Sequence, residues 1–140
     1  MRFMVIIKSN ERAEAGVMPS ERVLTEMGAY NEELVKAGVM LAAEGLHPSS
    51  RGARVRSVNG MLSVIDGPFT EAKELIAGFW ILQLRNIDEA IAWVKRVPNP
   101  DNEDWEIEIR QVGELEEFGD AFGPELRAQD ERIRASIRSQ

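Results

Sequence analysis

The longest apolar run of the chain, Leu75–Leu82, places the strongest limit on what it can fold into. Read as a strand over residues 75–85, the run carries apolar side chains on both faces, because successive residues of a strand point to opposite sides. Such a strand belongs in the middle of a sheet that is covered on both faces. The run Phe3–Ile7 has the same character, so we predict two central strands. Gly78, inside the longer run, is typical of a bulge or of the close approach of another group.

Two segments have the spacing of apolar residues that is typical of helices lying on a sheet. The first covers residues 20–37 and begins at Ser20, which is a good N-cap residue. The second covers residues 86–97, where Asn86 and Glu89 have the spacing of a capping box. We therefore predict two helices, one after each central strand.

The rest of the first 112 residues contains three shorter strand patterns and a loop. Residues 39–44 and 105–110 are expected to form further strands, and residues 9–19 a loop. Asn59-Gly60 is a strong turn signal between the alternating segments 54–58 and 61–65, which predicts a β-hairpin. Since the hairpin pattern has one polar face, we place it towards an edge of the sheet.

This order of elements predicts an α+β fold. With the hairpin set aside it is the ferredoxin-like split βαβ pattern, an antiparallel sheet with two helices on one face. Residues 1–112 offer no further helix for the second face, although the central strands are apolar there. A second copy of the chain is the economical cover, so we predict a homodimer.

A polar turn leads into the longest apolar run, and its pattern D-G-P-F-x-E-x-K-E followed by G-F resembles the YCII-related family in its DGPF-domain branch. The matching residues are Asp66, Gly67, Pro68, Phe69, Glu71, Lys73, Glu74, Gly78 and Phe79. Residues 2–7, the corner at Gly45-Leu46 with Pro48, and residues 108–110 resemble the family's opening strand, its G-L-x-P corner and its closing strand. The resemblance implies a dimeric α/β barrel with a cleft between the sheet and neighbouring elements.

The resemblance covers a domain of residues 1–112 and leaves a charged C-terminal extension, residues 113–140. Pro124 is expected at the first turn of a helix that continues to about Arg138. Two interpretations of the extension remain open. It is either a surface appendage, or Phe118 and Phe122 pack on the domain or across the dimer.

Composition excludes several classes of protein. The net charge of −7 argues against nonspecific nucleic-acid binding and against anionic membrane surfaces. The chain has no cysteine, and it lacks glycine-rich phosphate loops, dinucleotide fingerprints and histidine spacings for metals. We therefore expect no cofactor and no metal, with a carboxylate-rich cation site left open. The apolar start is too short for a signal peptide or a membrane span, which favours the cytoplasm.

Asp66 and His47 are the candidates for catalytic residues. Asp66 ends a strand beside a turn, where its carboxylate can accept a proton or hold a cationic or hydroxyl-bearing ligand. The alternative is that it caps its own turn. His47 is the only histidine and can act as acid or base near neutral pH, or it is a half-exposed loop residue. The resemblance does not supply a histidine–aspartate dyad here, because the first helix carries Tyr30 and Asn31 at the relevant place.

Five further residues are candidates for ligand binding: Lys73, Glu71, Phe69, Arg110 and Glu108. The Lys73 ammonium, between carboxylates, can orient an anionic ligand, or the group is simply a solvated charged loop. Glu108 and Arg110 share the strand face that points away from the helices, where they line a polar cavity or form a surface ion pair or dimer contact.

Three functions follow from these residues. The first is a small-molecule-binding homodimer with a polar cleft near the DGPF turn and an unknown ligand. The second, which the family resemblance implies, is a regulatory or protein-interaction module linked to sigma-factor-dependent transcription. The third is an acid–base enzyme that uses Asp66 and His47.

Overall fold

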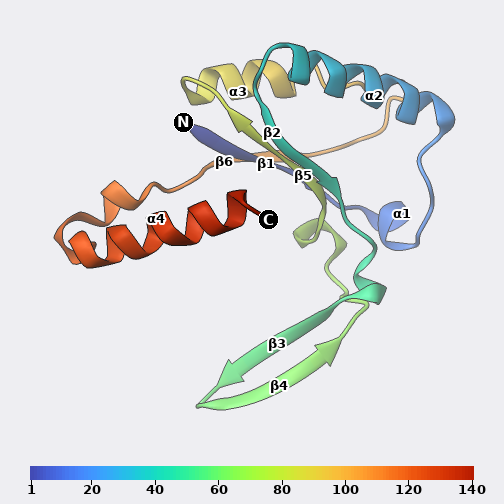
Figure 1. The fold of residues 1–140 in the computed structure, drawn as a ribbon. Helices are drawn as coiled ribbons and strands as arrows, with labels where there is room; N and C mark the ends of the chain where they lie inside the picture. Colours follow the sequence, from blue (N-terminus) through green and yellow to red (C-terminus); the bar gives the residue numbers. More distant parts are fainter.

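The computed structural model describes residues 1–140, and a four-stranded sheet forms its centre. The strands are β1 (Arg2–Lys8), β2 (Met40–Gly45), β5 (Ile76–Gln83) and β6 (Ile107–Gln111). They lie in the order β2-β5-β1-β6, and each neighbouring pair is antiparallel. The two runs that are apolar on both faces therefore form the two central strands, as predicted (Figure 1).

Two helices, α2 (Glu21–Lys36) and α3 (Ile87–Val94), lie on one face of this sheet (Figure 1). The Ser20 hydroxyl accepts a hydrogen bond from Val23 N at 3.2 Å, which confirms the predicted N-cap. At the second helix Asn86 accepts from Glu89 N at 3.0 Å. The Glu89 carboxylate accepts from Arg85 N rather than from Asn86 N, because it also pairs with the Arg85 side chain, so the predicted capping box is only half formed.

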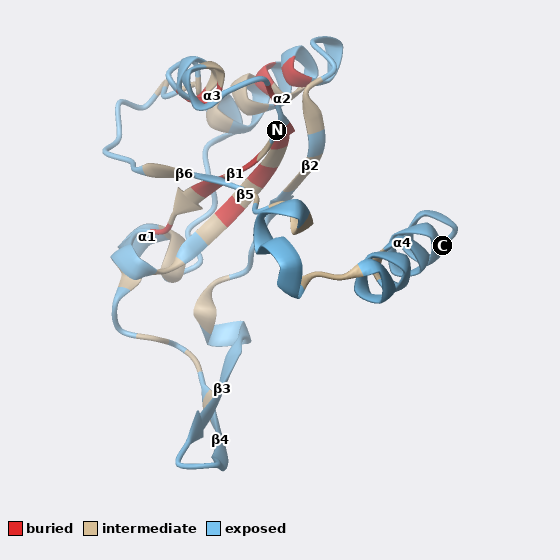
Figure 2. Cartoon of the chain, turned by 90° about the vertical axis from the view of Figure 1, so that its left-hand side faces the viewer, coloured by how far each residue is buried: buried red, intermediate tan, exposed pale blue.

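The hydrophobic core fills the space between the sheet and these two helices. Its centre contains Phe3 and Leu82 from the sheet and Leu34 from α2, all of them fully buried. Figure 2 shows the buried segments as a band along β1 and β5 and on the facing helices. Tyr30 and Trp80 pack edge to face, with ring centroids 5.8 Å apart. The contiguous core cluster therefore lies on the helix-covered face of the sheet.

The β-hairpin departs from the prediction. Strands β3 (Ala53–Val58) and β4 (Met61–Asp66) form a separate two-stranded sheet that projects away from the body (Figure 1). The placement at an edge of the main sheet was wrong. Val55 lies opposite Val64 on one face and Val58 opposite Met61 on the other, so neither face is uniformly polar. Nearly every hairpin residue is exposed.

Two further segments differ in detail from the expectations. The region expected to be a loop contains the short helix α1 (Glu11–Glu14), whose N-cap Asn10 accepts from Ala13 N at 2.8 Å. The strand expected from residue 105 begins at Ile107. Local capping by Asn10 explains the first difference, because an asparagine side chain satisfies the amides of a first helical turn.

The C-terminal extension contains a 3-10 segment (Leu115–Ala121) and helix α4 (Pro124–Arg138), with Pro124 at its first turn as predicted. The side chain of Phe118 is 64% exposed, and its ring contacts that of Phe122. Helix α4 buries no residue and makes no appreciable contact with the sheet. Phe118 therefore does not pack on the domain, whereas Phe122 is half-buried. No helix of the structure is both long enough and apolar enough to cross a membrane.

The second face of the sheet is not covered by α2 or α3. Register places Met4 and Ile6 of β1 beside Ile81 and Phe79 of β5 on this face. We call this surface the open sheet face.

Candidate functional site

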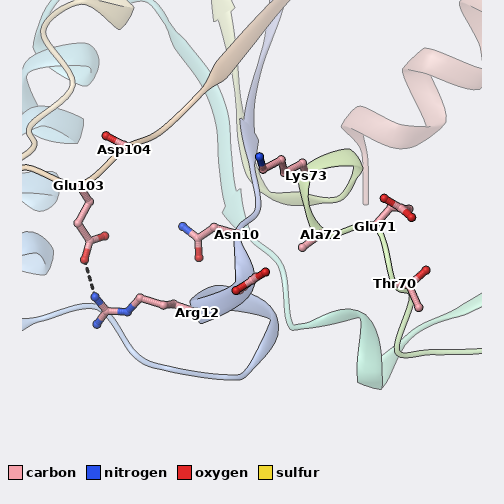
Figure 3. Close-up of a pocket in the computed structure, with 9 residues that line it drawn as sticks. Asn10, Arg12, Thr70, Glu71, Ala72, Lys73, Glu103 and Asp104 are labelled. Carbon is pink, nitrogen blue, oxygen red and sulfur yellow. Dashed lines mark hydrogen bonds and ion pairs between the residues drawn. The ribbon is translucent and has the colours of Figure 1, made fainter.

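A surface cleft of about 590 Å³ lies beside the DGPF segment. Three parts of the chain form its walls: the end of β1 with the start of α1, the segment after the DGPF turn, and the loop before β6 (Figure 3). The lining residues are Asn10, Glu11, Arg12, Thr70, Glu71, Ala72, Lys73, Glu103 and Asp104. Ala72 is the only hydrophobic residue among them, so the cleft is a polar one.

Of the two cations in the cleft, Arg12 forms an ion pair and Lys73 does not. Arg12 Nη1 lies 2.8 Å from Glu103 Oε1, so these two groups neutralise each other. Lys73 makes no ion pair within the chain. Figure 3 shows its ammonium group extending into the space beside Asn10 and Asp104, while Glu71 points the other way. Lys73 is therefore the cation of the cleft that is available to a ligand.

Ser49 holds two walls of the cleft at a set spacing. Its amide donates to Glu14 Oε1 at 2.9 Å, and its hydroxyl donates to the other oxygen of the same carboxylate. The hydroxyl oxygen in turn accepts from Phe69 N at 2.9 Å. Glu14 ends α1, whose first turn lines the cleft, and Phe69 directly precedes Thr70, the first cleft residue of the DGPF segment. We call this set of three hydrogen bonds the Ser49 bridge.

The backbone of Ser49 also packs so closely against residue 67 that only glycine fits there. A Cβ atom at this position would lie 1.7 Å from the carbonyl oxygen of Ser49, far inside any permitted distance. Gly67 N donates to the Gly52 carbonyl at 3.0 Å, and the Gly67–Pro68 peptide is cis. The Arg54 guanidinium lies 3.8 Å from the centroid of the Phe69 ring, within cation–π range. The DGPF turn thus closes the base of the hairpin, and Phe69 lies under Arg54 outside the set of cleft residues.

The two predicted catalytic residues do not line the cleft. Asp66 is the last residue of β4, is exposed, and makes no hydrogen bond that would cap its own turn. His47 is exposed, and its Nε2 lies 3.0 Å from Arg51 Nη1. No hydrogen bond links Asp66 to His47 within the chain, and the His47 imidazole instead lies beside Arg51.

Glu108 and Arg110 lie on the open sheet face, opposite Ile6 and Met4 in the register of β1 with β6. The Glu108 carboxylate lies 3.3 Å from Arg110 Nη1 and 3.6 Å from Lys8 Nζ. These residues form a charged strip at the side of the apolar open sheet face. They are separate from the cleft, so of the predicted ligand-binding residues the structure brings only Lys73 and Glu71 to it.

Sequence reasoning missed the other walls of the cleft. Asn10 and Arg12 lie in the segment expected to be a loop, and Glu103 and Asp104 in the loop before β6. A local signal existed for the second loop, because Asn99 closes it: its Oδ1 accepts from Glu103 N and its Nδ2 donates to Glu103 O. An asparagine between two prolines is a typical residue for such a turn. No group of three or more His, Cys, Asp or Glu side chains is arranged to hold a metal ion.

Comparisons with known proteins add a family to this geometry. Residues 1–116 match the YCII-related domain. The uncharacterized protein R00369 of Rhizobium meliloti (strain 1021) is 31% identical over 92 residues, which cover 66% of this chain and 74% of that protein. The structure is also similar to 5-chloro-2-hydroxyhydroquinone dehydrochlorinase (TftG) from Burkholderia phenoliruptrix AC1100, solved with 2,5-dihydroxybenzoquinone. That comparison has a TM-score of 0.46 and 14% identity, and covers 84% of this chain and 98% of TftG. The resemblance drawn from the DGPF pattern is confirmed by the match over residues 1–116: this chain belongs to the YCII-related family.

Proposed function

We propose that this protein is a homodimer that binds a small polar molecule in the cleft beside the DGPF segment. The observation that carries the proposal is a cleft of about 590 Å³ with polar walls and an unpaired Lys73. Its volume lies within the range of roughly 300–1,000 Å³ that is usual for small-molecule sites. No observation in a single copy favours the acid–base enzyme, since Asp66 and His47 lie outside the cleft.

The charges of the cleft limit the chemistry of the ligand. Four carboxylates and two cations line it, and the Arg12–Glu103 pair cancels one of each. Lys73 then offers an ammonium group to a carboxylate, carbonyl or hydroxyl oxygen, and Asp104 offers an acceptor to hydroxyl or amino groups. The best fit is a small molecule that has one acidic or carbonyl group and several hydrogen-bond donors.

The proposed homodimer is supported by the surface that one chain leaves exposed. The accessible surface is 10420 Å², whereas a compact monomer of this mass exposes about 7,300 Å². The difference of about 3,100 Å² is more than the ~800 Å² that each partner contributes to a standard interface. The antiparallel order β2-β5-β1-β6, with both helices on one face, supports a ferredoxin-like fold whose open sheet face meets that of a second copy.

A thermal-shift screen of polar metabolites tests the cleft. Ligands that raise the melting temperature of the wild type should raise that of Lys73→Met much less, because losing a charge-assisted hydrogen bond weakens binding about tenfold or more. Lys95→Met is the matched control, since Lys95 is exposed at the end of α3 and does not line the cleft. If every stabilising ligand acted equally on wild type and Lys73→Met, the cleft would not be the binding site. Asp66→Ala in the same screen tests its predicted role as an anchor.

A further inference from the structure

The β3–β4 hairpin is the part of the domain that neither the core nor the cleft explains. It contacts no other element to an appreciable extent, and it projects from the body in both views (Figures 1 and 2). A two-stranded hairpin alone in water is marginally stable at best. One face nevertheless carries the exposed apolar side chains of Val58 and Met61 next to Arg56. The hairpin therefore presents a surface that requires a partner.

The charge of the hairpin indicates what that partner is. Residues 51–66 contain the cations Arg51, Arg54 and Arg56 and a single carboxylate, Asp66. The 3-10 segment and the residue before it, 114–121, carry four carboxylates and no cation. Phe118 lies in the middle of this acidic segment and is 64% exposed. The two segments therefore carry opposite charges, and each exposes apolar side chains that the other could cover.

The same hairpin and acidic segment of one chain do not meet. Both views show the hairpin well separated from α4 and the segment before it (Figures 1 and 2). In Figure 1 helices α2 and α3 lie above the sheet, and α4 and the hairpin lie below it. A second copy placed on the open sheet face would therefore lie between the hairpin and the acidic segment of the first chain. Two-fold symmetry would then allow each hairpin to reach the other chain.

We propose that the β3–β4 hairpin is a dimerisation arm that docks on the acidic segment, residues 114–121, of a second copy of this chain. The face with Val58 and Met61 covers the partner's Phe118, and Arg56 on the same face meets the carboxylates around it. The proposal rests on the homodimer proposed above. The excess surface of about 3,100 Å² per chain leaves room for such a contact beside the ~800 Å² of a standard interface. Most of the acidic segment lies beyond residue 116, outside the family match.

Site-directed cross-linking tests the arm directly, because the chain has no cysteine of its own. Ser63→Cys, on the hairpin face with Arg56, and Ala121→Cys, in the acidic segment, are small changes at exposed positions. The two single variants are mixed, allowed to exchange subunits, and treated with a bismaleimide of short span. We expect a Ser63→Cys to Ala121→Cys adduct to form at least tenfold faster than the adduct of Ala121→Cys with Ala29→Cys, an exposed control on α2.

Sedimentation of the wild type separates the two ways in which the proposal can fail. A monomer at micromolar concentration would overturn both the homodimer and the arm. A dimer whose hairpin adduct forms no faster than the α2 control would overturn the arm and leave the homodimer standing. As an independent measurement, Arg56→Glu should raise the dimer dissociation constant about tenfold, since it replaces attraction by repulsion. Arg22→Glu, on α2, makes the same change of net charge and should leave the constant unaltered.

Discussion

Replacing Gly67 by alanine tests whether the DGPF turn is a close-packed joint or an ordinary loop. The added Cβ would lie 1.7 Å from the Ser49 carbonyl oxygen and 2.6 Å from its carbon, where ordinary contact begins at 3.4 Å. Both neighbours are backbone atoms, so no side-chain rotation can relieve the overlap. The chain at Ser49 has to move, and the Ser49 bridge moves with it.

The hydrogen bonds of the Ser49 bridge set the size of the effect. The bond from Phe69 N to the Ser49 hydroxyl contributes about 1 kcal/mol, and each of the two bonds to the Glu14 carboxylate about 1.5–3 kcal/mol. Because some of these groups regain partners in water after the shift, we expect the free energy of unfolding of Gly67→Ala to fall by about 3 kcal/mol. That is a large share of the ~5–15 kcal/mol that stabilises a typical domain.

Urea unfolding followed by tryptophan fluorescence measures this change. Gly28→Ala is the matched control, because a Cβ there meets nothing within 4 Å and the position lies inside α2. Removing a glycine from a helix interior should stabilise the protein by up to about 1 kcal/mol. The two glycine-to-alanine changes are therefore expected to shift the urea midpoint in opposite directions. A Gly67→Ala protein within ~0.5 kcal/mol of wild type, at unchanged slope, would refute the close-packed joint.

Two further predictions concern the core. Burial raises the pKa of Tyr30 from 10.0 to about 12, despite the opposing effect of Arg96, so the protonated phenol stabilises the folded state below pH 10. The free energy of unfolding should then fall by about 3 kcal/mol as the pH rises from 10 to 12. Urea unfolding of Tyr30→Phe, measured at the same pH values, should not show this fall. Leu34→Ala should cost about 2–5 kcal/mol because the side chain is fully buried. Val35→Ala, at a 62% exposed neighbour, should change stability by less than ~0.5 kcal/mol, and equal losses at the two positions would contradict the assigned helix face.

Local patterns in the chain were sufficient to predict most of the secondary structure. The apolar runs at β1 and β5 identify central strands because a strand exposes every second side chain to each face. Ser20 and Pro124 mark helix starts because capping and a fixed φ act within one turn. The close approach predicted at Gly78 is confirmed, since a Cβ there would lie 2.8 Å from the Glu44 carbonyl of β2.

The hairpin shows where such patterns fail. Its alternation predicts one wet face and a place at the sheet edge, but Val58 and Met61 lie on the face opposite Val55 and Val64. Side-chain alternation reports which residues share a face and carries no information about what lies opposite that face. The partner of an exposed surface is a property of the whole assembly, so the homodimer and the position of the hairpin in it stay predictions.

By itself the sequence determined the order of strands and helices, the family, and the importance of the DGPF turn, because capping, periodicity and turn chemistry act between residues close in the chain. Only the tertiary structure decided which polar residues share a cleft. Asn10, Lys73 and Asp104 are far apart in the chain and meet because the sheet and the Ser49 bridge bring their loops together. Polar loop residues have no periodic pattern that would reveal this meeting, since their positions follow from where the strands end.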